Sequence, residues 1–178
     1  MMVDQSFTNS IDWGALAAYV GTLRVHGESA GSDAARQALE LIIGTANICE
    51  AVDHYVLNAP GAELVRQVLW QIRPWSAMQR CFEIYSQSES IDSRRKAVEL
   101  LRVVSDARVL SWLDRFLDDP DCSIQYCGAA IVDQLLWSSI VQPEKCRHVL
   151  AKMADHSNPA VRAIQTTISN RQSSCCGE

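Results

Sequence analysis

Apolar residues recur at spacings of three and four positions along almost the whole chain, and alternating runs rich in Val, Ile and Thr are missing. Such spacings place apolar side chains on one face of a helix, so the pattern predicts an all-α protein. Cap residues, glycines and prolines divide the chain into about ten helices. We expect them near 10–24, 32–44, 45–57, 61–73, 74–87, 92–105, 109–116, 122–138, 143–156 and 159–170.

A weak internal repeat of about thirty residues underlies this pattern. One place in each unit holds a long polar residue: Arg36, Arg66, Arg95, Gln125 and Arg162. The steps between these positions are 30, 29, 30 and 37 residues. A unit of that length holds two short helices and a turn, which cannot bury its own apolar stripe. The repeat therefore predicts helix pairs that stack side by side around one continuous core.

Three segments combine a turn with a following helix: Asn158-Pro159-Ala160-Val161-Arg162, Asp119-Pro120 followed by Ile124-Gln125, and, more loosely, Pro60 followed by Leu64-Val65-Arg66. They resemble the HEAT-repeat family, in which an Asp-Pro turn leads into a helix that bears Val-Arg. The resemblance covers residues 32–171 and implies a short right-handed α-solenoid of about five helical hairpins. It also implies that the second helices line a concave face and that each repeated arginine contacts an acidic residue of a neighbour.

The chain length and composition predict one domain over residues 1–178, because 178 residues with 48 % hydrophobic content are too few for two well-buried cores. We expect residues 1–31 to cap the stack, residues 32–171 to form the repeats, and residues 172–178 to be a disordered tail. The capping helix would carry one apolar stripe, made of Trp13, Leu16, Ala17, Val20 and Leu23.

The charge balance disfavours nucleic acid as a partner, since 16 basic against 21 acidic residues give a net charge of −5. Residues 1–9 lack the basic start and apolar run of a signal peptide, and the chain has no uninterrupted apolar stretch of membrane-spanning length. We therefore expect a cytoplasmic protein that does not contact membranes. The seven cysteines form an odd set without C-x-x-C, which favours reduced thiols; the role of Cys175 and Cys176 stays open.

The common catalytic and ligand-binding motifs are absent from the sequence: it has no P-loop, no G-x-G-x-x-G and no H-E-x-x-H. Cys146 and His148 are two positions apart and would point in different directions on a helix. Asp118, Asp119 and Asp121 are explained by helix capping without a bound cation. We expect no enzymatic activity, no cofactor and no metal site.

A helical wheel of each repeat predicts which side chains face away from the core. The expected partner-binding residues on that row are Gln67, Trp70, Glu99, Tyr126, Asp133 and Trp137. Aromatic side chains supply interface anchors, and the carboxylates, together with Glu40 and opposed by Lys96 alone, would select a basic partner. The alternative for Trp70 and Trp137 is packing between repeats.

Small acidic solenoids without catalytic motifs resemble the immunity proteins that bacteria pair with toxins. The leading interpretation is therefore a non-enzymatic module that neutralises a cognate toxin by covering a basic domain with an acidic, aromatic surface. One alternative is a generic scaffold or assembly chaperone. The other is an enzyme on a HEAT-like scaffold, either a DNA glycosylase or a bilin lyase. The glycosylase requires a cationic groove, which the sequence does not predict.

Overall fold

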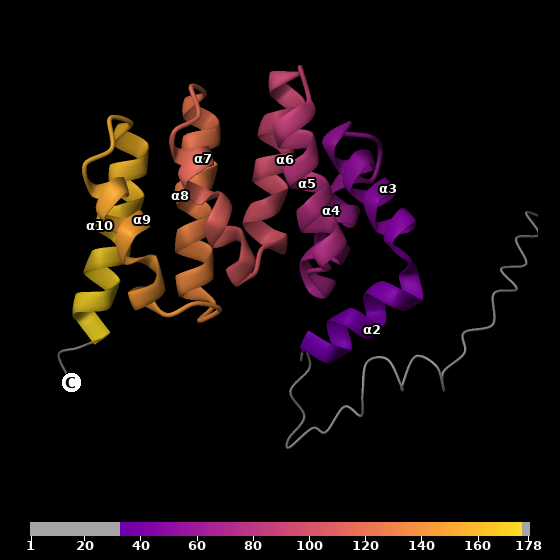
Figure 1. The fold of residues 1–178 in the computed structure, drawn as a ribbon, viewed down its shortest axis with the longest axis horizontal. Coiled ribbons are helices and arrows are strands. Elements are labelled where there is room, and N and C mark those ends of the chain that lie inside the picture. Colours follow the sequence, from indigo (N-terminus) through magenta and orange to yellow (C-terminus); the bar gives the residue numbers. More distant parts are fainter. Residues whose placement is uncertain (1–32, 176–178) are drawn as a thin grey trace, which may run out of the picture.

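The computed structural model describes residues 33–175, and the side chains of residues 36–172. Every regular element in this range is a helix, which confirms the all-α prediction for this part of the chain (Figure 1). The predicted helix at 10–24 and the capping role of residues 1–31 lie outside it. The elements are α2 (Asp33–Ile43), α3 (Thr45–Val56), α4 (Ala62–Ile72), α5 (Trp75–Gln87), α6 (Ile91–Val104), the 3₁₀ helix η1 (Ala107–Trp112), α7 (Leu113–Leu117), α8 (Cys122–Trp137), the 3₁₀ helix η2 (Pro143–Cys146), α9 (Arg147–Ala154) and α10 (Pro159–Cys175).

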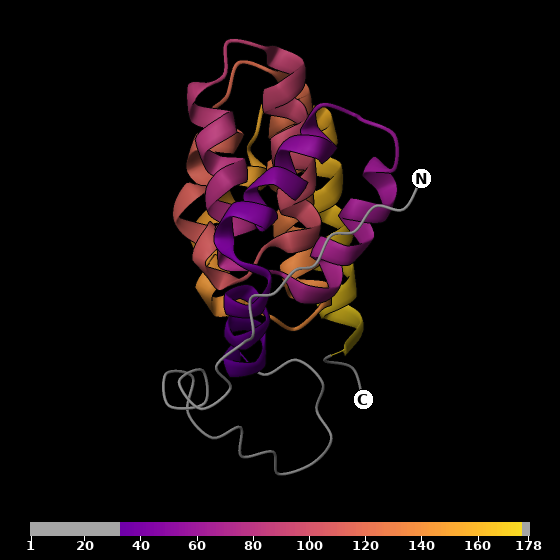
Figure 2. The same cartoon turned by 90° about the vertical axis from the view of Figure 1, so that its right-hand side faces the viewer.

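Helices that follow one another in the chain pack as pairs: α3 with α4, α5 with α6, α7 with α8, and α9 with α10. The second helices of these pairs also contact one another in order, α4 with α6, α6 with α8, and α8 with α10. Among the first helices, α3 contacts α5 and α7 contacts α9. The pairs follow one another along the long axis in Figure 1, and in Figure 2 the later pairs lie behind the earlier ones.

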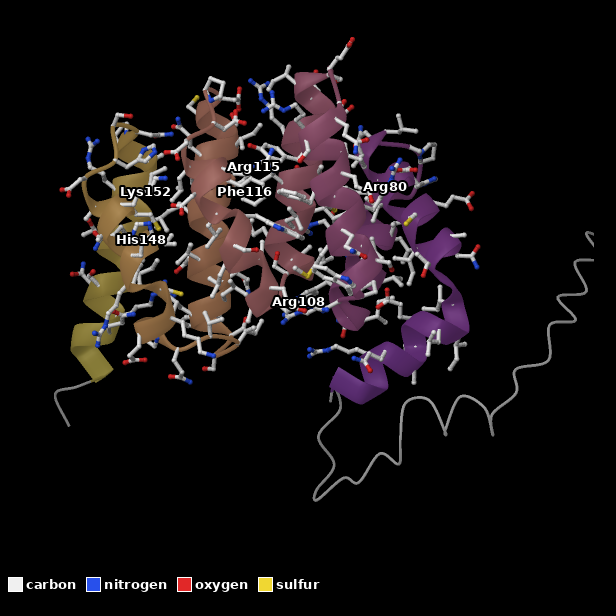
Figure 3. The ribbon with its side chains drawn as sticks, viewed as in Figure 1. Arg80, Arg108, Arg115, Phe116, His148 and Lys152 are labelled. Carbon is white, nitrogen blue, oxygen red and sulfur yellow. The ribbon has the colours of Figure 1, made fainter. Side chains whose placement is uncertain are left out.

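Aromatic side chains connect α5 to the segment formed by η1 and α7. The rings of Trp75 and Phe82 stack on Trp112, with centroids 5.8 and 4.2 Å apart. The guanidinium of Arg108 lies 4.1 Å from the centroid of Trp75, and that of Arg115 lies 5.0 Å from the centroid of Phe82. Figure 3 labels both arginines between the first and the last helix pairs. These half-buried rings join α5 to η1 and α7.

The apolar stripes of the helices meet in one core. Its largest fully buried side chains are Tyr55, Phe116, Ile48, Leu69, Met78, Leu100, Leu101, Leu113, Leu117, Ile124, Ile131 and Leu135. They come from α3 through α8, so consecutive pairs share one core, as expected for repeats that cannot fold alone.

Helices α7 and α8 approach each other closely at Gly128 of α8. A Cβ atom at this position would lie 2.8 Å from the Cβ of Phe116 on α7, a distance at which atoms overlap. The glycine therefore lets the two helix backbones come together.

Most predicted helix ends agree with the structure, and the acidic turn before α8 is the clearest case. Asp121 is the N-cap of α8, and its carboxylate accepts hydrogen bonds from the backbone N–H groups of Ser123 and Ile124 at 3.0 and 3.1 Å. Pro74 lies at the N-cap of α5, next to Arg73 in the left-handed conformation at φ 40°. The predicted joint at Pro74 is thus a sharp reversal between two helices.

Helix α3 begins at Thr45 as predicted, and its N-cap is Gly44 at φ 83°, a conformation that a glycine adopts at little cost. Two other boundaries differ from the prediction. The chain after Asp106 forms η1 before α7, because the Asp106 carboxylate accepts a hydrogen bond from the backbone N–H of Arg108, two residues on. At the other end α10 continues to Cys175, past its predicted end at 170.

Within residues 33–175, no helix combines the length and the apolar character that crossing a bilayer requires.

Candidate functional site

The expected partner-binding residues lie on three helices that contact one another in sequence. Gln67 and Trp70 belong to α4 and Glu99 belongs to α6. The other three, Tyr126, Asp133 and Trp137, belong to α8. The exposed fractions are 45 % for Trp70, 42 % for Tyr126 and 70 % for Trp137. We call the surface formed by α4, α6 and α8 the α4–α8 face.

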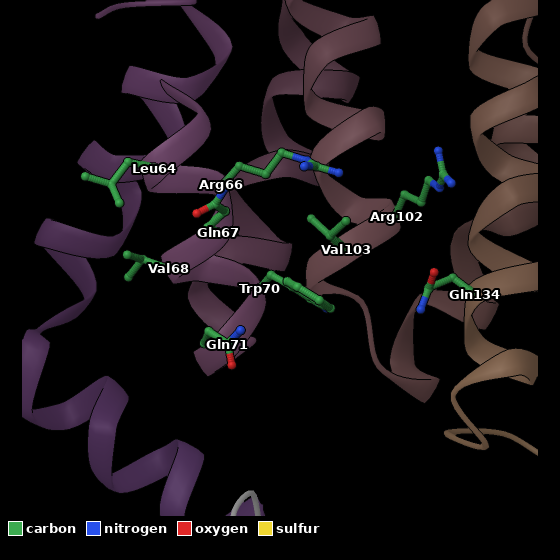
Figure 4. Close-up of a pocket in the computed structure, with 9 residues that line it drawn as sticks. All are labelled: Leu64, Arg66, Gln67, Val68, Trp70, Gln71, Arg102, Val103 and Gln134. Atoms are coloured by element: carbon green, nitrogen blue, oxygen red, sulfur yellow. The ribbon is translucent and has the colours of Figure 1, made fainter. Parts of the chain in front are cut away.

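A pocket of about 530 Å³ opens on this face (Figure 4). The nine residues shown there line it: Leu64, Arg66, Gln67, Val68, Trp70 and Gln71 from α4, Arg102 and Val103 from α6, and Gln134 from α8. We call it the α4–α8 pocket. It brings Gln67 and Trp70 together, and it does not include Glu99, Tyr126, Asp133 or Trp137. The predicted row is therefore divided between one pocket and four residues outside it, of which Tyr126 and Trp137 are exposed and Glu99 and Asp133 are half-buried.

Two cations, Arg66 and Arg102, line the pocket although the sequence pattern does not predict them there. A helical wheel gives the direction of a Cα–Cβ bond but not the reach of a long side chain. In Figure 4 the Arg66 side chain extends from α4 towards α6. The Arg102 guanidinium lies beyond it, on the side of α8. The charged residues that line the pocket are these two arginines.

The carboxylates of the row are compensated, which corrects the expectation of an acidic groove opposed by Lys96 alone. Glu99 accepts a hydrogen bond from Lys96 Nζ at 3.0 Å, and Asp133 pairs with Arg171 of α10. Glu40 does not join the row at all. Its carboxylate accepts hydrogen bonds from the backbone N–H groups of Trp75 and Ser76, at 3.0 and 2.8 Å, at the start of α5.

Arg171 fixes two of the predicted residues at once. Besides its ion pair with Asp133, its guanidinium lies 5.2 Å from the ring centroid of Trp137. Trp137 therefore makes a cation–π contact with α10, and it is still the most exposed aromatic residue of the α4–α8 face. It is available as an anchor for a partner.

Beneath the face, Tyr55 of α3 lies close to the charged pair of α6. Lys96 Nζ is 5.5 Å from the ring centroid of Tyr55. Burial raises the pKa of Tyr55 well above its usual value, and the Glu99 carboxylate adds to the effect. Both effects disfavour the charged phenolate, so Lys96 faces a neutral ring.

The repeated polar positions behave differently from one repeat to the next. Arg95 reaches Asp121 at the start of α8, with Nη2 and Oδ2 2.6 Å apart, as the HEAT resemblance implies. Gln125 donates to the carbonyl oxygen of Asp119 at 2.7 Å. Arg66 pairs with Glu63 of its own helix at 3.4 Å. Arg162 instead donates to the carbonyl oxygens of the turn before α10, those of His156 and Ser157.

A second, larger pocket of about 770 Å³ lies between α2, α5 and η1. Its lining includes Arg36, Arg73 and Arg108 together with Glu40 and Asp106. Glu40 is used as a cap of α5, and Asp106 holds Arg108 at 2.5 Å. Glu40, Asp106 and Arg108 of this pocket thus serve local structure.

Three of the described cysteines, Cys81, Cys127 and Cys146, lack the features of reactive thiols. Burial raises the pKa of Cys127 to about 11, and it also raises the pKa values of Cys81 and Cys146. A thiol with a raised pKa carries little thiolate at physiological pH, and the thiolate is the nucleophile. Within the described residues, no group of three or more His, Cys, Asp or Glu side chains is placed to hold a metal ion.

Comparison with protein families, with curated proteins and with solved structures finds no match to this chain.

Proposed function

We propose that this chain is a non-enzymatic protein-binding module, built as a right-handed solenoid of HEAT-like hairpins, that docks a partner on its α4–α8 face. Two observations support the solenoid. Second helices contact one another in chain order, and the Arg95–Asp121 ion pair joins α6 to α8 where the family resemblance implies such a pair.

The observation that carries the proposal is the exposure of Trp70 in the α4–α8 pocket. Its ring is 45 % exposed, and it lines a pocket together with the exposed side chains of Leu64 and Val68. A large aromatic side chain beside aliphatic groups in a recess is the arrangement in which interface hot spots are found. Packing between repeats, the alternative for Trp70, would leave less of the ring in water.

The class of protein that we propose is an immunity protein, which would neutralise a cognate bacterial toxin in the cytoplasm. The aromatic anchors Trp70 and Trp137 support a protein partner. Net acidity of the face does not, because Glu99 and Asp133 are each paired with a cation. The proposal therefore rests on apolar anchoring, and the charge of the partner is a separate question.

The test is a quantitative binding measurement on a partner captured from the native host with the full-length chain. Trp70→Ala should weaken binding by about 2 kcal/mol or more, and Trp137→Ala by a smaller amount, because Trp137 also packs on Arg171. Leu57→Ala is the matched control, because Leu57 is 76 % exposed but lies at the end of α3, outside the α4–α8 pocket.

Wild-type affinity in both tryptophan variants would contradict the docking face. To test the immunity role, the captured partner is expressed alone and with the chain. Growth arrest that the wild-type chain relieves and Trp70→Ala does not relieve is the expected result. A partner without toxicity would favour a scaffold.

A further inference from the structure

We propose that the α4–α8 pocket binds a short segment of its partner protein in which an acidic side chain lies close to an apolar one. This inference rests on the proposed function and specifies the chemistry of the partner at that site.

The first step is the sign of the charge. In the part of the chain that the structure describes, the charged residues that line the pocket are Arg66 and Arg102, and neither Asp nor Glu lines it. Figure 4 shows the Arg66 side chain running towards α6 and the Arg102 guanidinium beyond it, so the positive charge lies at the α6–α8 side of the recess. A ligand group placed between them would be negative, because a cation there would face two like charges.

The second step concerns the hydrogen-bond donors of Arg66 and Arg102. Arg66 makes one side-chain hydrogen bond, from Nη1 to Glu63 at 3.4 Å, and its buried Nε has no hydrogen-bond partner in the described part of the chain. Over the same residues Arg102 takes part in no ion pair and no side-chain hydrogen bond. Arginine presents its donors in a planar fork that matches the two oxygens of a carboxylate. The buried Nε of Arg66 is out of reach of a ligand, but the Nη donors of Arg66, whose side chain is 34 % exposed, and those of the exposed Arg102 are left for an external carboxylate.

The third step is the apolar side of the recess. Leu64, Val68 and Trp70 are 66, 49 and 45 % exposed, and they line the same pocket as the arginines. Their exposed area favours an aliphatic or aromatic side chain of the ligand. The amides of Gln67 and Gln71, which also line the pocket, can bond to the backbone of an extended peptide. An acidic, apolar peptide uses all three features.

A nucleic acid fits the pocket less well. Its phosphates require an extended positive surface, whereas the chain has a net charge of −5 and Glu63 and Glu99 lie on the same helices as the two arginines. Its sugars and bases would also leave the aliphatic side chains of Leu64 and Val68 without an apolar partner.

The experiment selects displayed random peptides on the full-length chain and, in parallel, on the double variant Arg66→Gln, Arg102→Gln. Sequences enriched on the wild type should contain Asp or Glu together with Leu, Ile, Phe or Trp. An enriched peptide is then synthesised, and its affinity is measured for the single variants. Each Arg→Gln change should weaken it by about tenfold, the size expected of a charge-assisted hydrogen bond.

Arg147→Gln is the matched control. Arg147 is an exposed arginine of α9, outside the pocket, and this variant should bind the peptide as the wild type does. Circular dichroism checks the fold of each variant. Among the described residues, neither Arg66 nor Arg102 takes part in an ion pair between helices, so their helices should be retained.

Enrichment of basic or purely polar peptides, equal enrichment on the double variant, or no enrichment at all would overturn the inference. So would tight binding of a labelled DNA duplex in place of peptides.

Binding measurements on the host partner separate this inference from the proposed function. If Trp70→Ala loses that partner and the arginine variants keep it, docking on the α4–α8 face stands and the acidic ligand does not. If all of them keep it, both fail.

Discussion

Arg95 of α6 donates a hydrogen bond from Nη2 to Oδ2 of Asp121, 2.6 Å away, and the same aspartate is the N-cap of α8. One carboxylate thus orders the first turn of a helix and attaches it to the second helix of the preceding pair. Because α6 and α8 both contribute to the α4–α8 pocket, this contact helps to fix the relative position of its walls.

Replacing Asp121 should destabilise the protein through both of these roles. Asp121→Ala removes two cap hydrogen bonds and the ion pair with Arg95, and we expect a loss of about 1 to 3 kcal/mol in the free energy of unfolding. Urea denaturation followed by circular dichroism measures it. Asp155→Ala, at an exposed position after α9, is the control and should change stability by less than about 0.5 kcal/mol. Equal losses in the two variants would contradict the dual role.

Asp121 should also make the free energy of unfolding depend on pH in the acidic range. The hydrogen bond from Arg95 holds the pKa of Asp121 below its usual value of 3.8. The folded protein therefore keeps this carboxylate ionised at a pH where the unfolded chain protonates it. Its contribution is complete above the unfolded pKa and is lost as the pH falls through the folded pKa.

Urea midpoints measured from neutral to strongly acidic pH test this dependence. Asp121→Asn should lose less stability over the acidic range than the wild type loses. Arg95→Gln should move the decline to higher pH, because the lowering of the pKa depends first on Arg95. Parallel curves for all three proteins would show that another group dominates the acid response.

A neighbouring carboxylate that is buried, Asp119, predicts a larger effect. The side chain of Asp119 is 2 % exposed; it pairs with Arg94 and accepts a hydrogen bond from Tyr85 Oη at 3.0 Å. Arg94→Ala leaves this charge buried without its cation, and we expect a loss of about 3 kcal/mol. Adding Asp119→Asn to that variant should restore part of the loss, since an amide carries no charge. Thermal unfolding compares the variants; a double variant less stable than Arg94→Ala would refute the account.

The close approach of α7 and α8 predicts that Gly128→Ala is destabilising although alanine favours helices. The added Cβ would overlap with the Cβ of Phe116, an atom that no rotamer change can move away. We expect the overlap to lower the free energy of unfolding by about 1 to 3 kcal/mol. The higher helix propensity of alanine offsets at most about 1 kcal/mol of that loss. Gly128→Ser should be less stable still. A Gly128→Ala protein that melts at or above the wild-type temperature would mean that the two helices separate freely.

The positions of the helices and the face that carries the exposed aromatics could be predicted because both depend on local periodicity. The residues around Asp121 show this best, since proline and the carboxylates mark a helix start from a few neighbouring positions. Within the described residues, the six expected partner-binding side chains fall on three contacting helices because one wheel applies to every repeat.

The charge of the face could not be predicted, since it depends on pairings between residues far apart in the chain. Asp133 meets Arg171 across 38 residues, and Glu40 meets the start of α5 across 35. A count of charged residues along one face of the repeats includes neither Arg171 nor the backbone N–H groups at the start of α5. The reach of Arg66 into the pocket is likewise a matter of side-chain rotamers, which the periodicity does not encode.

The contacts of Arg171 bear on where the protein can be shortened. The periodicity places the end of the last helix near 170, and a chain cut there would retain every apolar position of the predicted repeats. It would also lose the cation that pairs with Asp133 and supports Trp137. In such a shortened protein Asp133 would be left as an unpaired negative charge on the α4–α8 face, and Trp137 would lose its cation–π contact. Its binding behaviour would therefore not represent that of the full chain.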